Sequence, residues 1–442
     1  MKRSIVPTLI LLVVAATAIR SHADDWPQWL GPKRDSVWHE SGIVASFPKE
    51  GLPIKWRVPV GHGYGGVAVA GNKVYLMDYD RTYGKVENAP DGRRLIDGTE
   101  RVLCVDAETG TTIWKHEFDR PYNLSYPGGP RVTPTVADGK VYALGAEGNF
   151  WCLDATSGKL LWSRDYRKDY GLDTPIWGYS SHPVVEGDTV YCIVGGDGST
   201  AIAYDKDSGT EKWRALSSPE PGYGTPNLIT HAGHKQLIVW HAQSINSLNP
   251  KTGESLWSLP LKPGYNMAVM TPRQHGRFLF ASAIGYIGAL IELDSQKPRA
   301  SFAWRGNTKN AVYCVNSTPF IEEGIIYGCN VETSELIAVR METAERLWAT
   351  KQPTIGLGNR ARHGTAFIVK HEDHFFLFNE SGDLILADLK PSGYHEISRF
   401  HVLEPTNEAF GRPVVWTHPA FALKSCFARN DKELVRVDLA SH

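Results

Sequence analysis

The chain has 442 residues, of which 42% are hydrophobic and 21% charged, so it is globular rather than disordered. This length exceeds what one ordinary core needs, and it indicates either several domains or a repeat architecture that grows by adding units. The 47 basic and 48 acidic residues nearly cancel and no basic cluster is present, which argues against binding nucleic acid or another polyanion.

The first 23 residues are typical of a signal peptide. Two basic residues precede the uncharged apolar stretch 5–19, and the small residue Ala23 is suited to cleavage before Asp24. A membrane anchor is the weaker interpretation, because the stretch is short for a bilayer and Arg20 interrupts it. No cysteine lies near the cleavage point. We therefore expect a periplasmic or secreted protein that is not a lipoprotein and has no transmembrane segment.

One spacing recurs along the chain: an Asp, then a Gly four residues later, then a Trp four residues after the Gly. An apolar strand precedes each Asp, while Asp and Gly are typical turn residues. The Trp falls on the returning strand, where its ring can pack against a neighbouring sheet. The spacing therefore predicts a β-hairpin. It occurs at Asp106, Gly110 and Trp114, at Asp154, Gly158 and Trp162, and at Asp205, Gly209 and Trp213, with variants at Asn249, Gly253 and Trp257 and at Arg340, Ala344 and Trp348.

A second pattern precedes the hairpins. A Pro after Thr, Ser or His opens an apolar strand, and a turn and a further strand, often containing Val-Tyr or Ile-Tyr, follow. Proline cannot donate to a β-ladder, so its fixed place indicates an edge strand, such as the innermost strand of a propeller blade. The prolines are Pro134, Pro183, Pro226, Pro272, Pro319 and Pro419, and Thr365-Ala366 fits without one.

Together the two patterns give four strands per unit and about 43 to 53 residues between successive units. They predict an all-β fold, an eight-bladed β-propeller of four-stranded antiparallel blades. The last unit ends in a strand at 434–438, and a strand with an unassigned Trp lies within 52–60. We expect residues 52–60 to complete the last blade and close the ring, which removes an exposed edge. Residues 24–442 would then form a single domain.

Two smaller features complete the fold prediction. An insertion in the first blade, roughly 78–100, is rich in charged residues and is interpreted as a solvated hairpin, with a functional cap as the alternative. The six cysteines lie in apolar strand patterns and are interpreted as small buried hydrophobic residues. No CxxC spacing exists, so we expect no zinc site.

The Asp-x-x-x-Gly-x-x-x-Trp hairpin, the Val-Tyr strand and the opening Trp26-Pro27-Gln28-Trp29-Leu30-Gly31-Pro32 resemble PQQ-like (quinoprotein-type) repeat propellers, exported proteins common in bacteria such as planctomycetes. The resemblance covers residues 26–442. It implies two activities. One is that of a quinoprotein alcohol dehydrogenase, in which pyrroloquinoline quinone (PQQ) lies on the axis beside Ca²⁺ and an Asp acts as base. The other is that of a scaffold similar to the BamB-type outer-membrane assembly factor, which binds protein.

The sequence departs from both patterns. Quinoprotein dehydrogenases carry two adjacent cysteines near the cofactor, and no two cysteines are adjacent here. No Glu-Asn-Asp calcium set can be matched to this chain, and the lipid-anchoring Cys of the scaffold proteins is absent. The resemblance therefore predicts no cofactor firmly and no metal ligand, and PQQ with Ca²⁺ stays open.

Ligands of propellers bind where the inner strands and their connecting loops face the axis. His182 and His418 replace the Thr found at the same repeat position elsewhere, which hints at a specialised role. The plainer alternative is that each ring satisfies a water or a neighbouring carbonyl. The axial candidates for binding are Arg131, Trp177, His182, Asn316, Arg362, His363, Trp416 and His418.

The other candidates carry two interpretations as well. Arg362 beside His363 could hold a carboxylate through its guanidinium fork or could form a salt-bridged loop. Trp177 and Trp416 could stack on a flat ligand or could plug the channel.

The leading hypothesis is an exported propeller, expected to be a monomer, that binds a protein partner or a small-molecule ligand at its axial face. The alternative is a quinoprotein-like oxidoreductase, and a lyase or hydrolase with an acid–base pair in the channel is a third. No catalytic residue is assigned.

Overall fold

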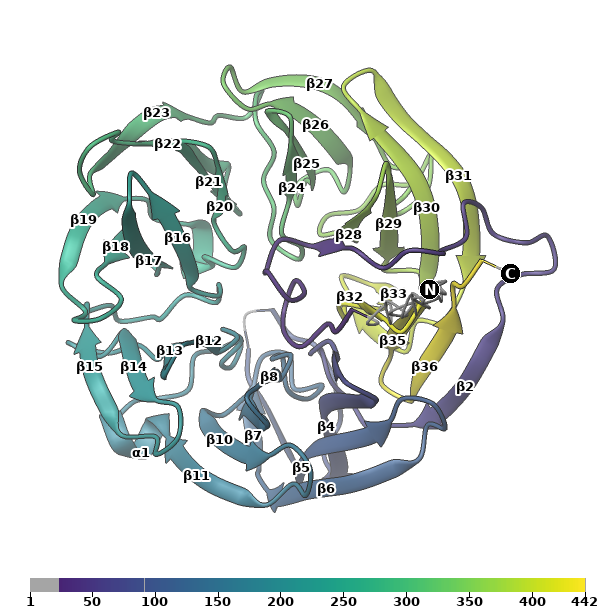
Figure 1. Cartoon of the computed structure of the whole chain (residues 1–442), viewed down its shortest axis with the longest axis horizontal. Coiled ribbons are helices and arrows are strands. Elements are labelled where there is room, and N and C mark those ends of the chain that lie inside the picture. The colour runs from purple at the N-terminus through teal and green to yellow at the C-terminus, as the bar shows by residue number, and fades with distance from the viewer. Residues whose placement is uncertain (1–23, 91, 442) are drawn as a thin grey trace, which may run out of the picture.

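A computed structural model describes residues 24–90 and 92–441. Eight antiparallel blades stand around a central axis, each with a short strand innermost and a longer one outermost (Figure 1). The first three blades consist of β3 (Ala68–Ala70), β4 (Lys73–Tyr83), β5 (Arg94–Asp106) and β6 (Thr112–Asp119); β8 (Thr135–Ala137), β9 (Lys140–Leu144), β10 (Asn149–Asp154) and β11 (Leu160–Asp165); and β12 (Val184–Glu186), β13 (Thr189–Ile193), β14 (Ala201–Asp205) and β15 (Glu211–Ala215).

The next four blades repeat this order. They consist of β16 (Asn227–His231), β17 (His234–Trp240), β18 (Ser244–Leu248) and β19 (Ser255–Pro260); β20 (Arg273–His275), β21 (Phe278–Ala283), β22 (Ile287–Leu293) and β23 (Ala300–Arg305); β24 (Phe320–Glu322), β25 (Ile325–Cys329), β26 (Leu336–Arg340) and β27 (Glu345–Thr350); and β28 (Ala366–His371), β29 (His374–Asn379), β30 (Asp383–Lys390) and β31 (Gly393–His401).

The eighth blade joins the two ends of the described chain. It contains β34 (Ala420–Ala422), β35 (Ser425–Arg429) and β36 (Glu433–Asp438), and its outer strand is β2 (Ile54–Pro59). Strands β2 and β36 are antiparallel, with Ile54 opposite Val437 and Pro59 opposite Glu433. The predicted eight-bladed, all-β fold and its closure by an N-terminal strand are confirmed.

The repeated Asp, Gly and Trp connect one blade to the next. Asp106 Oδ1 accepts the backbone N–H groups of Glu108 and Thr109 at 3.0 and 2.8 Å, which builds the turn. The Trp114 indole donates to the carbonyl of Ala155 in the second blade at 3.2 Å. The same bond recurs at Trp162, Trp213, Trp304 and Trp348, and at Trp56 it ties the eighth blade to the first through Ala107 at 2.9 Å.

The insertion in the first blade differs in part from the expected solvated hairpin. Strands β4 and β5 extend it from the sheet, and Tyr83 near its tip is exposed. Its base is buried, however, because Tyr79 stacks on Tyr122 of β7 (Tyr122–Leu124) with ring centroids 4.1 Å apart. The alternating charged residues concealed this apolar base in the sequence.

The few remaining elements lie between the blades. Helix α1 (Tyr166–Tyr170) begins after Asp165, whose side chain accepts the Lys168 N–H, and a 3₁₀ turn spans Gly264–Asn266. Strands β32 (Asn407–Ala409) and β33 (Arg412–Val414) form a separate hairpin. All six cysteines are buried and free. No helix in the described ranges is long and apolar enough to cross a membrane.

Residues 24–44, the N-terminal strap, cross one end of the central channel before the chain reaches β2 (Figure 1). Their β1 (Val37–Trp38) pairs in parallel with β28 of the seventh blade. Trp26 bridges to Val69 of the first blade, and the Pro27 carbonyl accepts the Val136 N–H of the second blade at 2.8 Å. Val69 and Val136 are the middle residues of the inner strands β3 and β8. The strap therefore packs against inner strands that surround the channel.

Candidate functional site

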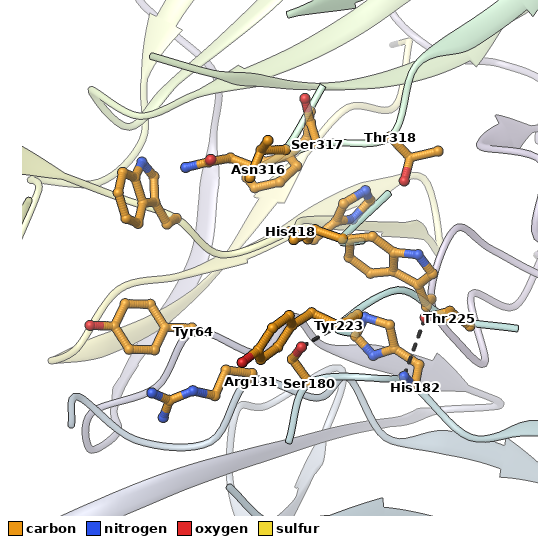
Figure 2. A pocket seen from close by; sticks show the side chains of 15 residues that line it. Tyr64, Arg131, Ser180, His182, Tyr223, Thr225, Asn316, Ser317, Thr318 and His418 are labelled. Carbon is orange, nitrogen blue, oxygen red and sulfur yellow. Dashed lines mark hydrogen bonds between the residues drawn. The ribbon is translucent and has the colours of Figure 1, made fainter. Parts of the chain in front are cut away.

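A cavity of about 130 Å³ lies on the axis, where the inner strands begin. Asn316, Ser317 and Thr318 face Arg131, Ser180 and His182 across it (Figure 2). Five of the eight predicted axial residues line this cavity: Arg131, His182, Asn316, Trp416 and His418. The structure thus brings together most of the residues that precede the recurrent prolines.

Two of the predicted residues, Trp177 and His363, do not line the cavity but contact residues that do. Trp177 packs edge-to-face on the cavity-lining Tyr223 at 5.6 Å, and its carbonyl accepts Arg131 Nε at 2.9 Å. His363 contacts Asn316 through Nδ1 at 3.3 Å and stacks on Phe410 with ring centroids 4.4 Å apart. Both side chains therefore support residues that line the cavity.

Arg362 lies outside the cavity. Its guanidinium is exposed and pairs with Glu332. This is the salt-bridged loop that the sequence left open as an alternative. The neighbouring backbone turns so that His363 points inward to Asn316, which directs Arg362 outward.

Three of the residues that precede a recurrent Pro tie their blade to the preceding one. Thr225 Oγ1 accepts the His182 N–H at 3.2 Å, and Thr318 Oγ1 accepts the Thr271 N–H at 3.4 Å. His182 makes the equivalent bond with its ring, because Nδ1 accepts the Thr133 N–H at 2.9 Å. At position 182 the substitution of His for Thr therefore preserves the blade-to-blade bond and adds an imidazole to the cavity wall, whereas the His418 ring contacts the carbonyl of its own neighbour Pro419.

The two cavity histidines are neutral and have opposite tautomers. Burial lowers the pKa of His182 to about 3 and that of His418 to about 4. His182 accepts at Nδ1, so its proton is on Nε2. His418 Nδ1 contacts the Pro419 carbonyl at 2.8 Å and therefore carries the proton, which leaves the Nε2 lone pair free to accept.

Trp29 of the strap fills the channel between these two rings. Its ring lies 4.3 Å from that of His182, nearly parallel to it, and 4.5 Å from that of His418. Sequence reasoning missed Trp29 as a site residue. The available signal was an aromatic pair, Trp26 and Trp29, that follows the predicted cleavage point and belongs to no blade.

Arg131 places a buried cation in the cavity wall. Besides Trp177, its guanidinium donates to the carbonyls of Gly129 and Tyr126 and lies 5.2 Å from the centre of the Tyr64 ring. Desolvation lowers its pKa from the ordinary arginine value. Within the described ranges it forms no ion pair, so backbone carbonyls and an aromatic face replace a carboxylate.

The lining does not suit a quinone–calcium pair. Calcium takes six to eight oxygen ligands and favours carboxylates, yet the fifteen lining residues include neither Asp nor Glu. No cluster of three or more His, Cys, Asp or Glu in the described part of the chain could hold a metal ion. The cavity is also close in size to one that holds a benzene molecule, roughly 150 Å³. The residues present therefore do not fit PQQ with Ca²⁺.

Comparison with known proteins gives a family match and a shared fold. Residues 98–301 match the family model described as outer membrane protein assembly factor BamB. No curated protein sequence matches the chain. BamB from Moraxella catarrhalis is 13% identical with a TM-score of 0.56, and the likeness covers 88% of this chain and 98% of that one.

Two enzymes have the same fold. The quinohemoprotein alcohol dehydrogenase from Comamonas testosteroni is 14% identical with a TM-score of 0.58, covering 96% of this chain and 82% of that one. A europium-containing methanol dehydrogenase is 12% identical with a TM-score of 0.57, covering 94% and 89%. At such identities the likeness shows the fold alone.

Proposed function

The chain is a PQQ-like β-propeller, and from that premise we propose that it is an exported binding protein whose axial face engages a protein partner or a small ligand. The observation that carries this proposal is the chemistry of the cavity lining. It combines hydroxyl, amide and aromatic groups with a single arginine and no carboxylate. Such a lining can bind a ligand group through hydrogen bonds and aromatic contacts and fix its orientation.

The same lining is poorly suited to acid–base chemistry. An efficient general acid or base has a pKa near the working pH. The pKa values of His182 and His418, about 3 and about 4, are far from neutrality. This favours binding over the lyase or hydrolase alternative.

Exposed apolar side chains in the loops that lead into the inner strands support a partner-binding role. Tyr265 and Leu357, 74% and 71% exposed, lie in loops that lead from an outer strand to the next inner strand. Phe410 is 48% exposed at the turn between β32 and β33. Tyr265 and Phe410 have φ angles of +54° and +52°, where bulky side chains are strained. We call these three residues the rim. Exposed aromatic groups of this kind are enriched in protein interfaces.

A variant at the rim tests partner binding. The wild type and Phe410→Asn, with Asn chosen because it tolerates positive φ, would be used to capture proteins from the exported fraction. We expect Phe410→Asn to lose a partner that the wild type retains. The matched control is Ile113→Asn, which removes an exposed apolar side chain from the outer strand β6. Equal capture by all three proteins would contradict the proposal.

The oxidoreductase alternative is tested separately by adding PQQ and Ca²⁺ during thermal unfolding and by dye reduction with alcohols. A ligand that binds the native state raises the melting temperature by linkage. We expect neither a rise nor dye reduction, because the cavity lacks carboxylate ligands. A rise together with dye reduction would make the enzyme the better interpretation.

Export and the monomeric state are part of the proposal. Residues 1–23, the predicted signal peptide, lie outside the described residues. We expect a reporter fused after residue 60 to be exported only when residues 1–23 are present, and light scattering of the mature chain to give the mass of one copy. A cytoplasmic reporter would contradict export.

A further inference from the structure

The free hydrogen-bonding groups of the axial cavity are mostly donors. Trp29 Nε1 is buried and has no hydrogen-bond partner among the described residues. His182 carries its proton on Nε2, because Nδ1 is occupied by the Thr133 N–H. The only ring acceptor left is His418 Nε2.

Two threonine hydroxyls add to this surplus. The oxygens of Thr225 and Thr318 already accept backbone N–H groups, so their hydrogens remain for a ligand. Asn316 contributes little, because His363 engages both ends of its amide. A group that enters the cavity therefore meets donors from several sides and needs acceptor lone pairs of its own.

The charge of the cavity points to the same kind of ligand. Arg131 contributes a positive charge to the wall, and none of the lining residues is acidic. Glu100 and Glu147, which raise the pKa of Arg131 through their charge, are not among the lining residues. All three guanidinium nitrogens donate to backbone carbonyls, so the positive charge of Arg131 is not neutralised by an ion pair, and an anion in the cavity would be the only negative charge among the lining groups.

The volume limits what can enter. About 130 Å³ accommodates a group smaller than a drug-sized ligand, whose pocket is typically about 300 Å³ or more. Phe367, Trp416 and Tyr223 supply apolar surface beside the polar groups. These walls suit a short hydrocarbon stem.

We propose that the axial cavity binds one carboxylate group on a short apolar stem, carried by a small organic acid or by an acidic side chain or chain terminus of the partner protein. A carboxylate offers about four lone-pair sites to the surrounding donors and complements the charge of Arg131. This inference rests on the proposed binding function and adds the chemical class of the bound group.

Propionate is the probe, and propionamide is its neutral counterpart of the same shape. The readout is the indole N–H resonance of Trp29 in the ¹⁵N-labelled mature protein, identified by its loss in Trp29→Phe. We expect propionate to shift this resonance at roughly millimolar concentration, as suits so few atoms, and propionamide to bind at least about tenfold more weakly. No shift with propionate, or equal binding of both compounds, would overturn the proposal.

Variants test which groups hold the probe, with propionate binding followed by saturation-transfer NMR. Arg131→Met should weaken binding by about tenfold or more, whereas Arg131→Lys, which keeps the charge, should retain most of it. Arg362→Met is the matched control, because this arginine lies on the same face outside the cavity, and it should bind as the wild type does. If Arg131→Met does not fold, Trp29→Phe decides, since it keeps the ring and removes the indole donor. Propionate binding as strong as that of the wild type in Arg131→Met, or in Trp29→Phe where Arg131→Met does not fold, would overturn the proposal.

Competition distinguishes the source of the carboxylate. Propionate should release a captured partner if the partner supplies the group, and should leave it bound if a free acid is the ligand. The cavity proposal and the binding function can fail separately. If propionate does not bind but capture still depends on Phe410, only the carboxylate inference falls. If capture is independent of Phe410 while propionate shifts the Trp29 resonance, only the partner-binding role falls.

Discussion

Trp114 of the first blade lies against Gly158 of the second, so closely that a β-carbon on the glycine would come within 2.6 Å of the indole ring. Gly158 also has a φ of +71°, a left-handed conformation that side chains disfavour. One glycine thus meets two demands, a turn within its own blade and a surface for the ring of the preceding blade. The same contact recurs between Trp162 and Gly209.

Alanine substitutions at Gly158 and Gly139 separate the cost of the left-handed backbone from the cost of the contact with Trp114. We expect Gly158→Ala to lower the free energy of unfolding by about 2–4 kcal/mol, the sum of left-handed strain and overpacking. Gly139→Ala is the matched control, because Gly139 has a φ of +73° with nothing near its missing β-carbon. It should cost only about 1–2 kcal/mol. Urea unfolding of both variants provides the comparison, and equal losses would show that the Trp contact contributes little.

The ring closure can be tested at Trp56, the only one of these indoles contributed by β2. Trp56→Ala should reduce stability by about 2–4 kcal/mol, since the ring is partly buried against the first blade. It should also speed hydrogen exchange in β36, because the strand paired with β36 is loosened. Trp304→Ala, which weakens a junction between two internal blades, is the control and should leave exchange in β36 unchanged. Unaltered exchange in Trp56→Ala would contradict the closing role.

Acid should destabilise the protein through the cavity histidines. The unfolded chain binds a proton at each histidine below pH about 6.5, whereas the folded pKa values are about 3 for His182 and about 4 for His418. The stability these rings contribute is therefore complete above pH 6.5. It is lost as the pH falls toward 4, at about 1.4 kcal/mol per pH unit for each histidine.

The measurement is chemical unfolding between pH 7 and 4. We expect His182→Thr to reduce the fall of the unfolding free energy with pH by the contribution of one histidine. Thr is the chosen replacement because it makes this blade-to-blade bond elsewhere in the chain. His418→Thr should do the same, and the double variant should flatten the loss twice as much. A profile as steep as that of the wild type in the double variant would show that other groups govern acid unfolding.

Arg362 should contribute little to stability. It is exposed and pairs with Glu332 at the surface, and such pairs are typically worth about 0–1 kcal/mol. We therefore expect Arg362→Ala to shift the urea midpoint only slightly and to become still less distinguishable from the wild type in 0.5 M salt. A large loss of stability would indicate that the 359–363 loop depends on this pair.

The fold was predictable because its determinants are repeated at short range. Asp106, Gly110 and Trp114 lie within one hairpin, and the same spacing at Asp154 and Asp205 reveals the blade period. The strand at 52–60 was recognised because it carries the Trp that the last unit lacks. Such short-range patterns can be recognised from the sequence alone.

The cavity was only partly predictable. Arg131, His182 and His418 were found because they precede a strand that the repeat locates. Trp29 is not part of a repeat, and its partners His182 and His418 lie far away in the sequence. Arg362 resembled Arg131 in its position near the axis, but the direction of each side chain depends on loop geometry that no repeat specifies.

The pairing of β2 with β36 imposes an order on biosynthesis. Strand β2 is translated before the seven blades that separate it from β36, so a strand with an indole must wait unpaired while the intervening blades form. Throughout this delay, β2 can pair with the β36 strand of another copy. The joint that completes the finished ring is therefore also the place where two copies could exchange strands and become entangled.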